Sequence, residues 1–273
     1  MSVLLAIAAG ALVGLALGLT GGGGSIFAVP LLIYVLGLPP DRAVPVSLVA
    51  VALTALVGGI QSVRRRLVVW QPTMMFVLGG VVGAPLGILA ARHVPESALV
   101  AGFGLLALTV GCLMWRAALA FPTQASAVRA RQYETDGGPV CVLAPDGQLR
   151  FSAPCAAVLV VVGLGTGILS GLFGIGGGFL IVPALVFVTR MGVHRAVATS
   201  LLIIAAIGSA GAASALWHGR LDWPVLLPFA AGGAVAMLAG RRLAERLAGP
   251  RLQKTFALLI IGVGIAMLVD SLI

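Results

Sequence analysis

Two glycine-rich motifs in this chain combine residue types that can bind an anion. Gly-Leu-Thr-Gly-Gly-Gly-Gly-Ser begins at Gly18, and Gly-Leu-Phe-Gly-Ile-Gly-Gly-Gly begins at Gly171. Consecutive glycines do not hold a regular helix well, because each costs about 1 kcal/mol relative to alanine. A short helix that starts after such a break directs unpaired N–H groups and the positive end of its dipole at the break. Each motif therefore predicts a binding site for an oxyanion.

The two breaks supply the first group of candidate substrate-binding residues. Ser25 follows the first glycine run, at a plausible N-cap position of the short helix that we expect there. The other candidates are the glycines Gly22, Gly23, Gly24, Gly176, Gly177 and Gly178. Close helix packing is the alternative role for glycine, and we assign the GxxxGxxxG stripe of Gly10, Gly14 and Gly18 to it. Neither cluster completes a GxGxxG motif or a P-loop.

Hydroxyl and arginine side chains form the second group of candidates. Ser47 and the pair Thr199 and Ser200 each follow an Arg-Ala-Val sequence, about one turn inside an apolar run. Their hydroxyls can donate hydrogen bonds to an oxyanion, or they can bond back to carbonyls of their own helix. The first half has Val46 where the second has Thr199, so equal contacts from the two halves are not expected. Arg42 and Arg195 precede these hydroxyls, and we expect them at the two mouths of an anion pathway.

The sequence lacks the residues that a proton relay or an intramembrane hydrolase would need. No acidic, basic or histidine side chain lies in the middle of an apolar run, and intramembrane proton relays usually need one. His93, His194 and His218 stand at the ends of apolar runs, and Ser170 lacks a GxSxG motif, so an intramembrane hydrolase is not indicated. We predict no enzyme and no cofactor. What remains is facilitated anion flow, or coupling through protonation of the substrate itself.

Three cysteines, Cys112, Cys141 and Cys155, give neither a metal site nor a disulfide framework by their spacing. They are odd in number, none is part of a CxxC motif, and no histidine lies near them in the sequence. We therefore expect three isolated thiols and no bound metal.

Composition indicates a chain that is embedded in a membrane. Hydrophobic residues make up 60% of the sequence and charged residues 9%, and the mean hydropathy is +1.15. Runs of about twenty apolar residues match the thickness of a bilayer. The net charge of +9 does not indicate a nucleic-acid partner, because the basic residues stand at the ends of apolar runs. We expect a polytopic membrane protein in contact with lipid.

The chain is an internal duplication with an offset of 153 residues. From Gly18 to Leu48, 14 of 31 positions are identical to the residues 153 places later. Each half has five apolar runs, at 3–20, 25–38, 43–63, 71–91 and 97–118, and at 154–173, 178–189, 196–217, 223–240 and 255–272. The second run of each half is too short to cross ~30 Å of hydrocarbon, so it is a half-helix or a re-entrant segment. Because five is an odd number, the two repeats are expected to insert with opposite topology.

The distribution of basic residues predicts the orientation. With Arg64, Arg65 and Arg66 in the cytoplasm, 14 of the 17 Lys and Arg residues lie inside, and Arg42, Arg92 and Arg220 lie outside. This places both termini on the periplasmic or extracellular side. The expected domains are a first transmembrane repeat at 1–119, a polar cytoplasmic linker at 120–153 and a second transmembrane repeat at 154–273. Apolar sequences on either side of Pro145-Asp146-Gly147 suggest a β-hairpin in the linker.

The doubled motif resembles the sulfite exporter TauE/SafE family of bacterial permeases. The similarity rests on the two glycine motifs, on Val29-Pro30 and Val182-Pro183 behind them, and on the segment from Arg195 to Ser200. It implies an inner-membrane transporter that moves sulfite or a related organosulfur anion outward, through a central site between the repeats. A negative interior would assist the export of a monoanion by ~2.3 kcal/mol per 100 mV. A membrane scaffold or assembly factor that transports nothing is the alternative.

Overall fold

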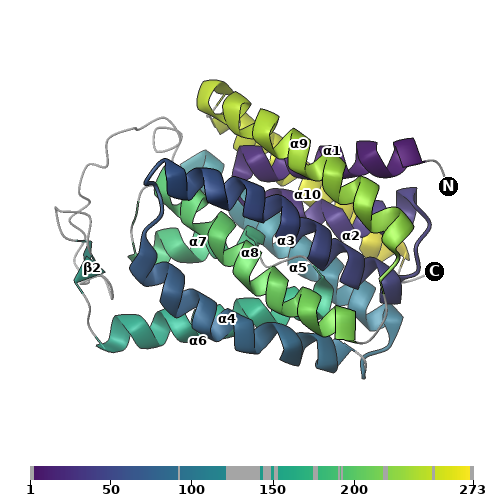
Figure 1. Cartoon of the computed structure of the whole chain (residues 1–273), viewed down its shortest axis with the longest axis horizontal. Helices are drawn as coiled ribbons and strands as arrows, with labels where there is room; N and C mark the ends of the chain where they lie inside the picture. The colour runs from purple at the N-terminus through teal and green to yellow at the C-terminus, as the bar shows by residue number, and fades with distance from the viewer. Residues whose placement is uncertain are drawn as a thin grey trace.

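The computed structural model describes most of the chain as a bundle of helices. The described residues are 3–91, 93–120, 142–143, 149–150, 153–174, 178–189, 191, 193–217, 221–247 and 250–270. The first half contains α1 (Val3–Thr20), η1 (Gly23–Phe27), α2 (Ala28–Pro30), η2 (Leu31–Val35), α3 (Pro40–Arg64), α4 (Trp70–Ala91) and α5 (Glu96–Ala120). The second half contains α6 (Ala153–Phe173), α7 (Gly178–Thr189), α8 (Val193–Trp217), α9 (Trp223–Leu247) and α10 (Pro250–Asp270). Most of the long helices run along the long axis of the molecule (Figure 1).

Six of the described helices are long and apolar enough to cross a membrane, judged by length and composition. They are α1, α3, α4, α6, α8 and α9. The longest of them contain 25 residues, which at 1.5 Å per residue span about 37 Å, more than the ~30 Å of a hydrocarbon core. A helix satisfies its own backbone polar groups, which a segment in lipid requires. The prediction of a helical, polytopic membrane protein is confirmed.

The two segments that follow the glycine motifs are short helices, as predicted. η1, α2 and η2 follow one another from Gly23 to Val35, and α7 has 12 residues. Twelve residues extend about 18 Å, less than the thickness of the hydrocarbon core. Pro30 has no N–H group and its ring crowds the preceding turn, and the helix widens into the π-type turn η2 directly after it.

Each principal helix pair joins one helix from each half. α1 packs on α9, α4 on α6, α3 on α8 and α5 on α10. Glycine stripes bring the backbones of the first two pairs together, because a Cβ atom at any stripe position would collide with the facing backbone. The stripes are Gly10, Gly14 and Gly18 on α1, and Gly163, Gly167 and Gly171 on α6. The predicted packing role of the α1 stripe is thus confirmed.

Gly167→Ala should lower the thermal stability of the protein, whereas Gly165→Ala on the same helix should leave it almost unchanged. A Cβ atom at Gly167 would lie 2.8 Å from the Cα of Gly80 on α4, while one at Gly165 would meet nothing within 4 Å. Overpacking of this kind costs about 1–3 kcal/mol. Thermal unfolding of the two purified variants in one detergent measures the difference. Equal unfolding temperatures would contradict the packing role.

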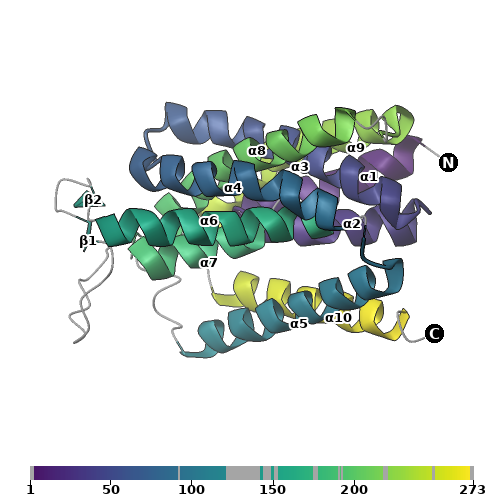
Figure 2. The same ribbon diagram turned by 90° about the horizontal axis from the view of Figure 1, so that it is seen from below.

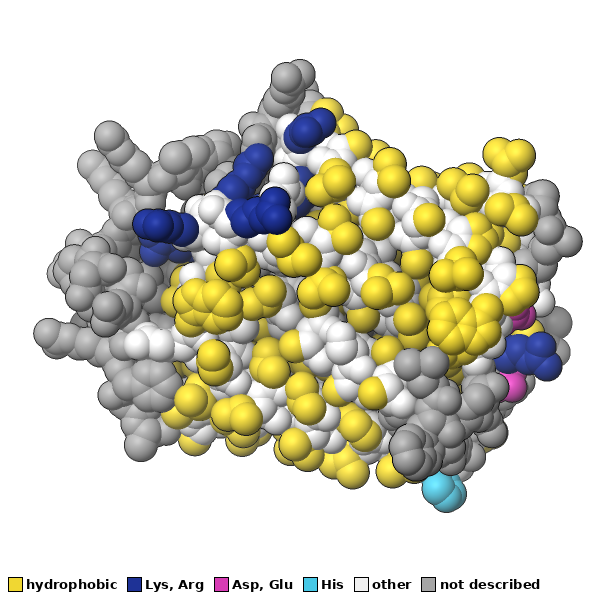
Figure 3. Space-filling view, in the orientation of Figure 1, with side chains coloured by type: hydrophobic (Ala, Val, Ile, Leu, Met, Phe, Trp, Pro, Cys, Tyr) yellow, Lys and Arg dark blue, Asp and Glu magenta, His cyan; other side chains and the backbone are white. Residues whose placement is uncertain are grey.

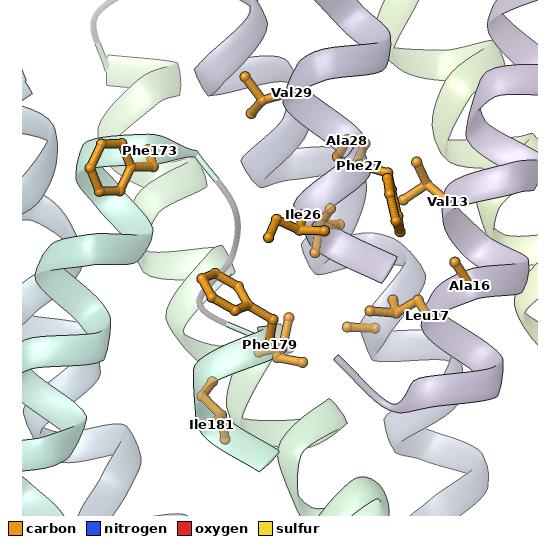
Figure 4. Packing of buried hydrophobic residues seen from close by; sticks show 14 of the residues in the cluster. Val13, Ala16, Leu17, Ile26, Phe27, Ala28, Val29, Phe173, Phe179 and Ile181 are labelled. Carbon is orange, nitrogen blue, oxygen red and sulfur yellow. The ribbon is translucent and has the colours of Figure 1, made fainter. Parts of the chain in front are cut away.

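The buried core is shared by the two halves. Side chains from α1, η1, α6 and α7, among them Leu17, Phe27, Phe173 and Phe179, belong to one buried hydrophobic cluster (Figure 4). The pair α5 and α10 forms a separate layer beside the other helices (Figure 2). Phe103 of α5 meets Phe173 of α6 edge to face, with ring centroids 6.0 Å apart. The halves therefore fold around a common interior.

The surface is apolar along the helices and basic at one end. Hydrophobic side chains cover much of the face in Figure 3, and Lys and Arg side chains gather at its left, where α3 and α9 end in Figure 1. Exposed Arg64, Arg65, Arg66 and Arg242 belong to these ends. α1 begins and α10 ends at the opposite end of the molecule (Figure 1). On this face, most of the described basic side chains thus lie at the end of the bundle where α3 and α9 end.

Two short strands and a disulfide-bonded cysteine are described near the second half's start. β1 (Val142–Leu143) pairs antiparallel with β2 (Leu149–Arg150), inside the stretch where the sequence suggests a hairpin. Cys112 is a free, exposed thiol, but the buried Cys155 on α6 is disulfide-bonded, so the expectation of isolated thiols is wrong for Cys155. The absence of a CxxC motif argues only against disulfides between cysteines that are close in sequence. A disulfide needs two cysteines that are close in the folded structure, and sequence spacing does not report this. Cys141 lies outside the described residues.

Candidate functional site

The two glycine breaks meet in the interior of the bundle. A Cβ atom at Gly22 would collide with the carbonyl group of Gly178, and one at Gly178 would lie 2.9 Å from the carbonyl oxygen of Gly22. Both glycines are buried, and η1 of the first half packs on α7 of the second half. Only glycine allows two backbones to approach this closely. Gly176 and Gly177, two other predicted site residues, lie outside the described residues.

A reciprocal pair of hydrogen bonds fastens each break to the opposite half. The Oγ atom of Ser200 donates to the carbonyl oxygen of Gly21 at 2.8 Å, and the Oγ atom of Ser47 donates to the carbonyl oxygen of Gly174. The offset of 153 residues relates Gly21 to Gly174 and Ser47 to Ser200. All four residues are buried. The duplication thus reappears in space as an exchange of equivalent contacts, which we call the glycine–serine junction.

The two glycines of the junction have backbone conformations that other residues rarely adopt. Gly21 has a φ angle of 74° and Gly174 one of 70°. A Cβ atom at Gly21 would collide with Val197, and one at Gly174 would lie 2.8 Å from Val44. Space and backbone angle therefore both require glycine. Each left-handed turn aims its carbonyl group at the serine of the other half.

Both junction serines also bond back to a carbonyl oxygen of their own helix, which is the alternative role that the sequence leaves open for them. Ser200 Oγ lies 2.8 Å from the carbonyl oxygen of Val197, and Ser47 Oγ lies 2.9 Å from that of Val44. Each hydroxyl proton is therefore shared between its own helix and the opposite glycine. Ser47 and Ser200 make equivalent contacts, although their neighbouring residues, Val46 and Thr199, differ.

Ser25 does not cap the short helix, so the N-cap prediction is wrong. Gly22 occupies the N-cap position, and Ser25 lies inside η1 with its Oγ donating to the carbonyl oxygen of Gly22 at 2.8 Å. The helical turn starts earlier because Gly24 packs directly on the backbone of Leu17, and this contact outweighs the poor helix propensity of glycine. Thr20, which precedes the N-cap position, supplies a side-chain acceptor to this first turn, since its Oγ1 accepts the N–H of Gly24 at 3.2 Å.

Thr199 contacts the residue that precedes α4. Its Oγ1 accepts the N–H group of Val69 at 3.2 Å, directly before the first residue of α4. The first N–H groups of a helix have no partner inside the helix, so this bond resembles a capping contact. Thr199 is fully buried. The adjacent hydroxyls of Thr199 and Ser200 therefore serve two different elements of the first half.

The two predicted mouth arginines lie on the first turns of α3 and α8. Both Arg42 and Arg195 are exposed. α3 and α8 are antiparallel, because Gly58 faces Leu201 while Gly211 faces Leu48. Arg42 and Arg195 therefore lie toward opposite ends of the bundle. Neither belongs to the glycine–serine junction.

One polar contact near the basic end was not predicted. Arg241 of α9 donates from Nη1 to the carbonyl oxygen of Gly58 at 2.5 Å and to Oγ of Ser62 at 2.7 Å, both on α3. The sequence offers Arg241 only as part of a basic pair, which the positive-inside rule already explains. The position 153 residues earlier is Ile88, so the first half has no equivalent. The described residues contain no group of three His, Cys, Asp or Glu side chains that could hold a metal ion.

Comparison with known proteins assigns the chain to a family. The family model described as "Sulfite exporter TauE/SafE" matches residues 6–267. The chain belongs to the TauE/SafE family. This membership makes it a relative of membrane transporters over nearly its whole length, so the resemblance seen in the sequence is confirmed.

Curated relatives of this TauE/SafE chain are named as transporters. A "Probable membrane transporter protein" of Xylella fastidiosa (strain 9a5c) is 38% identical over 267 residues, 97% of this chain and 94% of that protein. The "Probable membrane transporter protein YunE" of Bacillus subtilis is 26% identical over 85% of each chain. "Probable membrane transporter protein MamO" of Paramagnetospirillum magneticum is 26% identical over 97% of this chain and 44% of its own length. No solved structure matches the chain.

Proposed function

We propose that this TauE/SafE protein exports sulfite or a related organosulfur anion through a central site between two inverted repeats. The observation that carries the proposal is the glycine–serine junction, in which both breaks and both serines meet in the buried interior. Backbone N–H groups at helix starts and serine hydroxyls are donors suited to an oxyanion. The donor set contains no acidic side chain that would repel an anion.

The pattern of helix pairing supports the inverted relation of the repeats. Exchanging each helix for its counterpart turns the pair α1–α9 into α6–α4, and it leaves the pairs α3–α8 and α5–α10 unchanged. The antiparallel course of α3 and α8 agrees with opposite insertion of the two halves. The site would then lie at the interface of the repeats, as in other transporters with this type of duplication.

Binding of an anion requires the junction to rearrange. In the described conformation, the hydroxyls of Ser47 and Ser200 donate to the carbonyl oxygens of Gly174 and Gly21. An anion would replace these carbonyl oxygens as the acceptor, and the breaks would move apart to admit it. Hydrogen bonds to a charged acceptor are stronger than those to a neutral carbonyl, so binding would compensate for the lost contacts. Arg42 and Arg195 would attract the anion toward the two ends of the pathway.

We propose that the basic end lies in the cytoplasm and that both termini are periplasmic, in the inner membrane of a bacterium. The arginines at the ends of α3 and α9, together with the positive-inside rule, support this orientation. Whichever way the protein is inserted, a negative interior favours outward movement of a monoanion by ~2.3 kcal/mol per 100 mV.

Cysteine labelling tests the orientation. Asp41→Cys and Arg64→Cys place an exposed thiol on the first and last turns of α3. In a background without native cysteines, a membrane-impermeant maleimide added to intact cells should label the Asp41→Cys variant. It should label the Arg64→Cys variant only after permeabilisation. The reverse pattern would overturn the proposed orientation.

Anion flux in proteoliposomes tests the function itself. The purified full-length protein is reconstituted, and efflux of sulfite, sulfate, thiosulfate and a short alkyl sulfonate is measured under an imposed potential, negative on the side of the anion. We expect electrogenic flux of at least sulfite, above that of protein-free vesicles. A protein that moves none of these anions, although it is folded and correctly oriented, would instead agree with the scaffold role.

A further inference from the structure

The hydroxyl of Ser170 is a buried donor that the packing of the bundle leaves without a partner. Ser170 lies on the last turn of α6 and has no exposed surface. Among the described residues, its Oγ is the one buried hydroxyl oxygen without a hydrogen bond. Native proteins keep few such groups. In the unfolded chain water forms hydrogen bonds with the hydroxyl, and burial without a protein partner loses these bonds at a cost in free energy. An unpaired buried hydroxyl in a proposed transporter therefore calls for an explanation by function.

Other helical hydroxyls of this chain avoid this cost by bonding to their own helix. Many donate to a carbonyl oxygen three or four residues earlier, among them those of Thr20, Ser25, Thr54, Ser62, Thr73, Thr166 and Thr189. The same contact for Ser170 would use the carbonyl of Thr166, but the hydroxyl does not take it. The Ser170 hydroxyl therefore remains without an acceptor on its own helix.

Ser170 lies immediately before the second glycine break. Its carbonyl oxygen accepts the N–H of Gly174 at 2.9 Å, so it fixes the left-handed turn that Ser47 holds from the other half. α7, whose N-terminus follows the break, packs on α6. The counterpart of Ser170 is Leu17, and in the first half the backbone at Leu17 touches Gly24 of the break directly. The same position in the second half thus adjoins the junction.

The polarity of this face differs between the halves, although the packing is equivalent. Buried Val13 and Leu17 occupy in α1 the positions that Thr166 and Ser170 occupy in α6. The first half shows that the equivalent position can be buried without a hydroxyl. A polar residue in only one half indicates a role that belongs to that half.

We propose that Ser170 binds the transported oxyanion, donating its Oγ–H to an anion oxygen beside the N-terminus of α7. This assignment rests on the proposed function, and it makes the second half the more polar side of the site. The anion would meet the hydroxyl of Ser170, the positive end of the α7 dipole and the junction serines. Since these donors carry no formal charge, the site would select an anion by the position of its oxygen acceptors and not by pairing it with a positively charged side chain.

Ser170→Ala separates a ligand-binding role from a structural one. Sulfite efflux from proteoliposomes gives the half-saturating concentration, and thermal unfolding without sulfite gives the stability. We expect Ser170→Ala to raise the half-saturating concentration of sulfite roughly ten-fold or more. Its unfolding temperature should be equal to or above that of the wild-type protein, because the variant removes an unpaired buried hydroxyl.

Thr54→Val is the matched control. The Thr54 hydroxyl is buried too, but it donates to the carbonyl oxygen of Ala50 at 2.8 Å. The half-saturating concentration of this variant should equal that of the wild-type protein. Unchanged half-saturation in Ser170→Ala, or lower stability with normal transport, would overturn the role of Ser170 while leaving the proposed function intact. A wild-type protein that moves no sulfite, sulfate, thiosulfate or sulfonate would overturn both.

Discussion

Gly22→Ala should reduce anion flux by at least about ten-fold, while Gly23→Ala should retain most of it. A Cβ atom at Gly22 would collide with the carbonyl group of Gly178, which is backbone of the opposite half, so the extra methyl group would overpack this contact. A Cβ atom at Gly23 would lie 3.1 Å from Oγ1 of Thr20, so this side chain would need to move by only a few tenths of an ångström and no facing backbone is displaced. Efflux per protein molecule, measured in proteoliposomes, compares two variants that differ by one position.

The abundance and thermal stability of the two glycine variants provide the control. Overpacking costs about 1–3 kcal/mol, which a folded membrane protein can survive. Flux is therefore compared only between preparations with the same content of folded protein. Wild-type flux from Gly22→Ala would remove the contact between the breaks from the transport pathway. Equal losses from both variants would mean that any side chain in this glycine run is harmful, whatever it touches.

Ser47→Ala and Ser200→Ala should weaken apparent sulfite affinity to similar extents, by roughly ten-fold each. A hydrogen bond to a charged ligand contributes about 1.5–3 kcal/mol, and the two serines occupy equivalent positions in the junction. The sequence alone suggests a smaller contribution from Ser47, because its neighbour is Val46. The structure gives Ser47 the same contacts as Ser200, and the neighbour Thr199 holds Val69 instead. Flux titrated against sulfite concentration decides between the two expectations.

The double variant and Thr199→Val complete that experiment. If both serines bind one anion, their effects should depart from additivity in the double variant, because they share the ligand. Thr199→Val should lower stability by about 1 kcal/mol through the lost contact with Val69, and it should alter affinity less. A large affinity loss in Thr199→Val, with normal affinity in Ser47→Ala, would restore the asymmetry that the sequence suggests.

The helices were predictable from sequence because each depends on its own residues: an apolar run indicates a helix in lipid, and a glycine run indicates where a helix is interrupted. Ten apolar runs correspond to helical segments, and the glycine runs precede the two short ones. The ends were less predictable. α3 begins at Pro40 and α9 continues to Leu247, beyond the apolar runs at 43–63 and 223–240. Polar residues can extend a helix into the interface or solvent, where hydropathy carries no signal of its end.

The contacts of the candidate site were only partly predictable. The repeat pairs Ser47 with Ser200 and Gly21 with Gly174 in the alignment, but no sequence pattern says that each serine reaches the opposite glycine. The position of Ser25 inside η1, and the bond from the N–H of Gly24 to Thr20, accompany a close contact of Gly24 with the backbone of Leu17 that the sequence does not show. The unpaired hydroxyl of Ser170 has no signature in the sequence beyond its mismatch with Leu17.

The exchange of partners between the halves also constrains biogenesis. α1 is synthesised first, yet its main packing partner is α9, and Gly21 must wait for a serine 179 residues later in the chain. While the ribosome completes the second half, the first half holds glycine stripes and a broken helix that have no partner yet. Contacts so distant in sequence form late and leave intermediates exposed to misassembly. The repeats are thus units of ancestry rather than of assembly. The glycine–serine junction has to wait for Ser200, and the pairs α1–α9 and α5–α10 can be completed only later still.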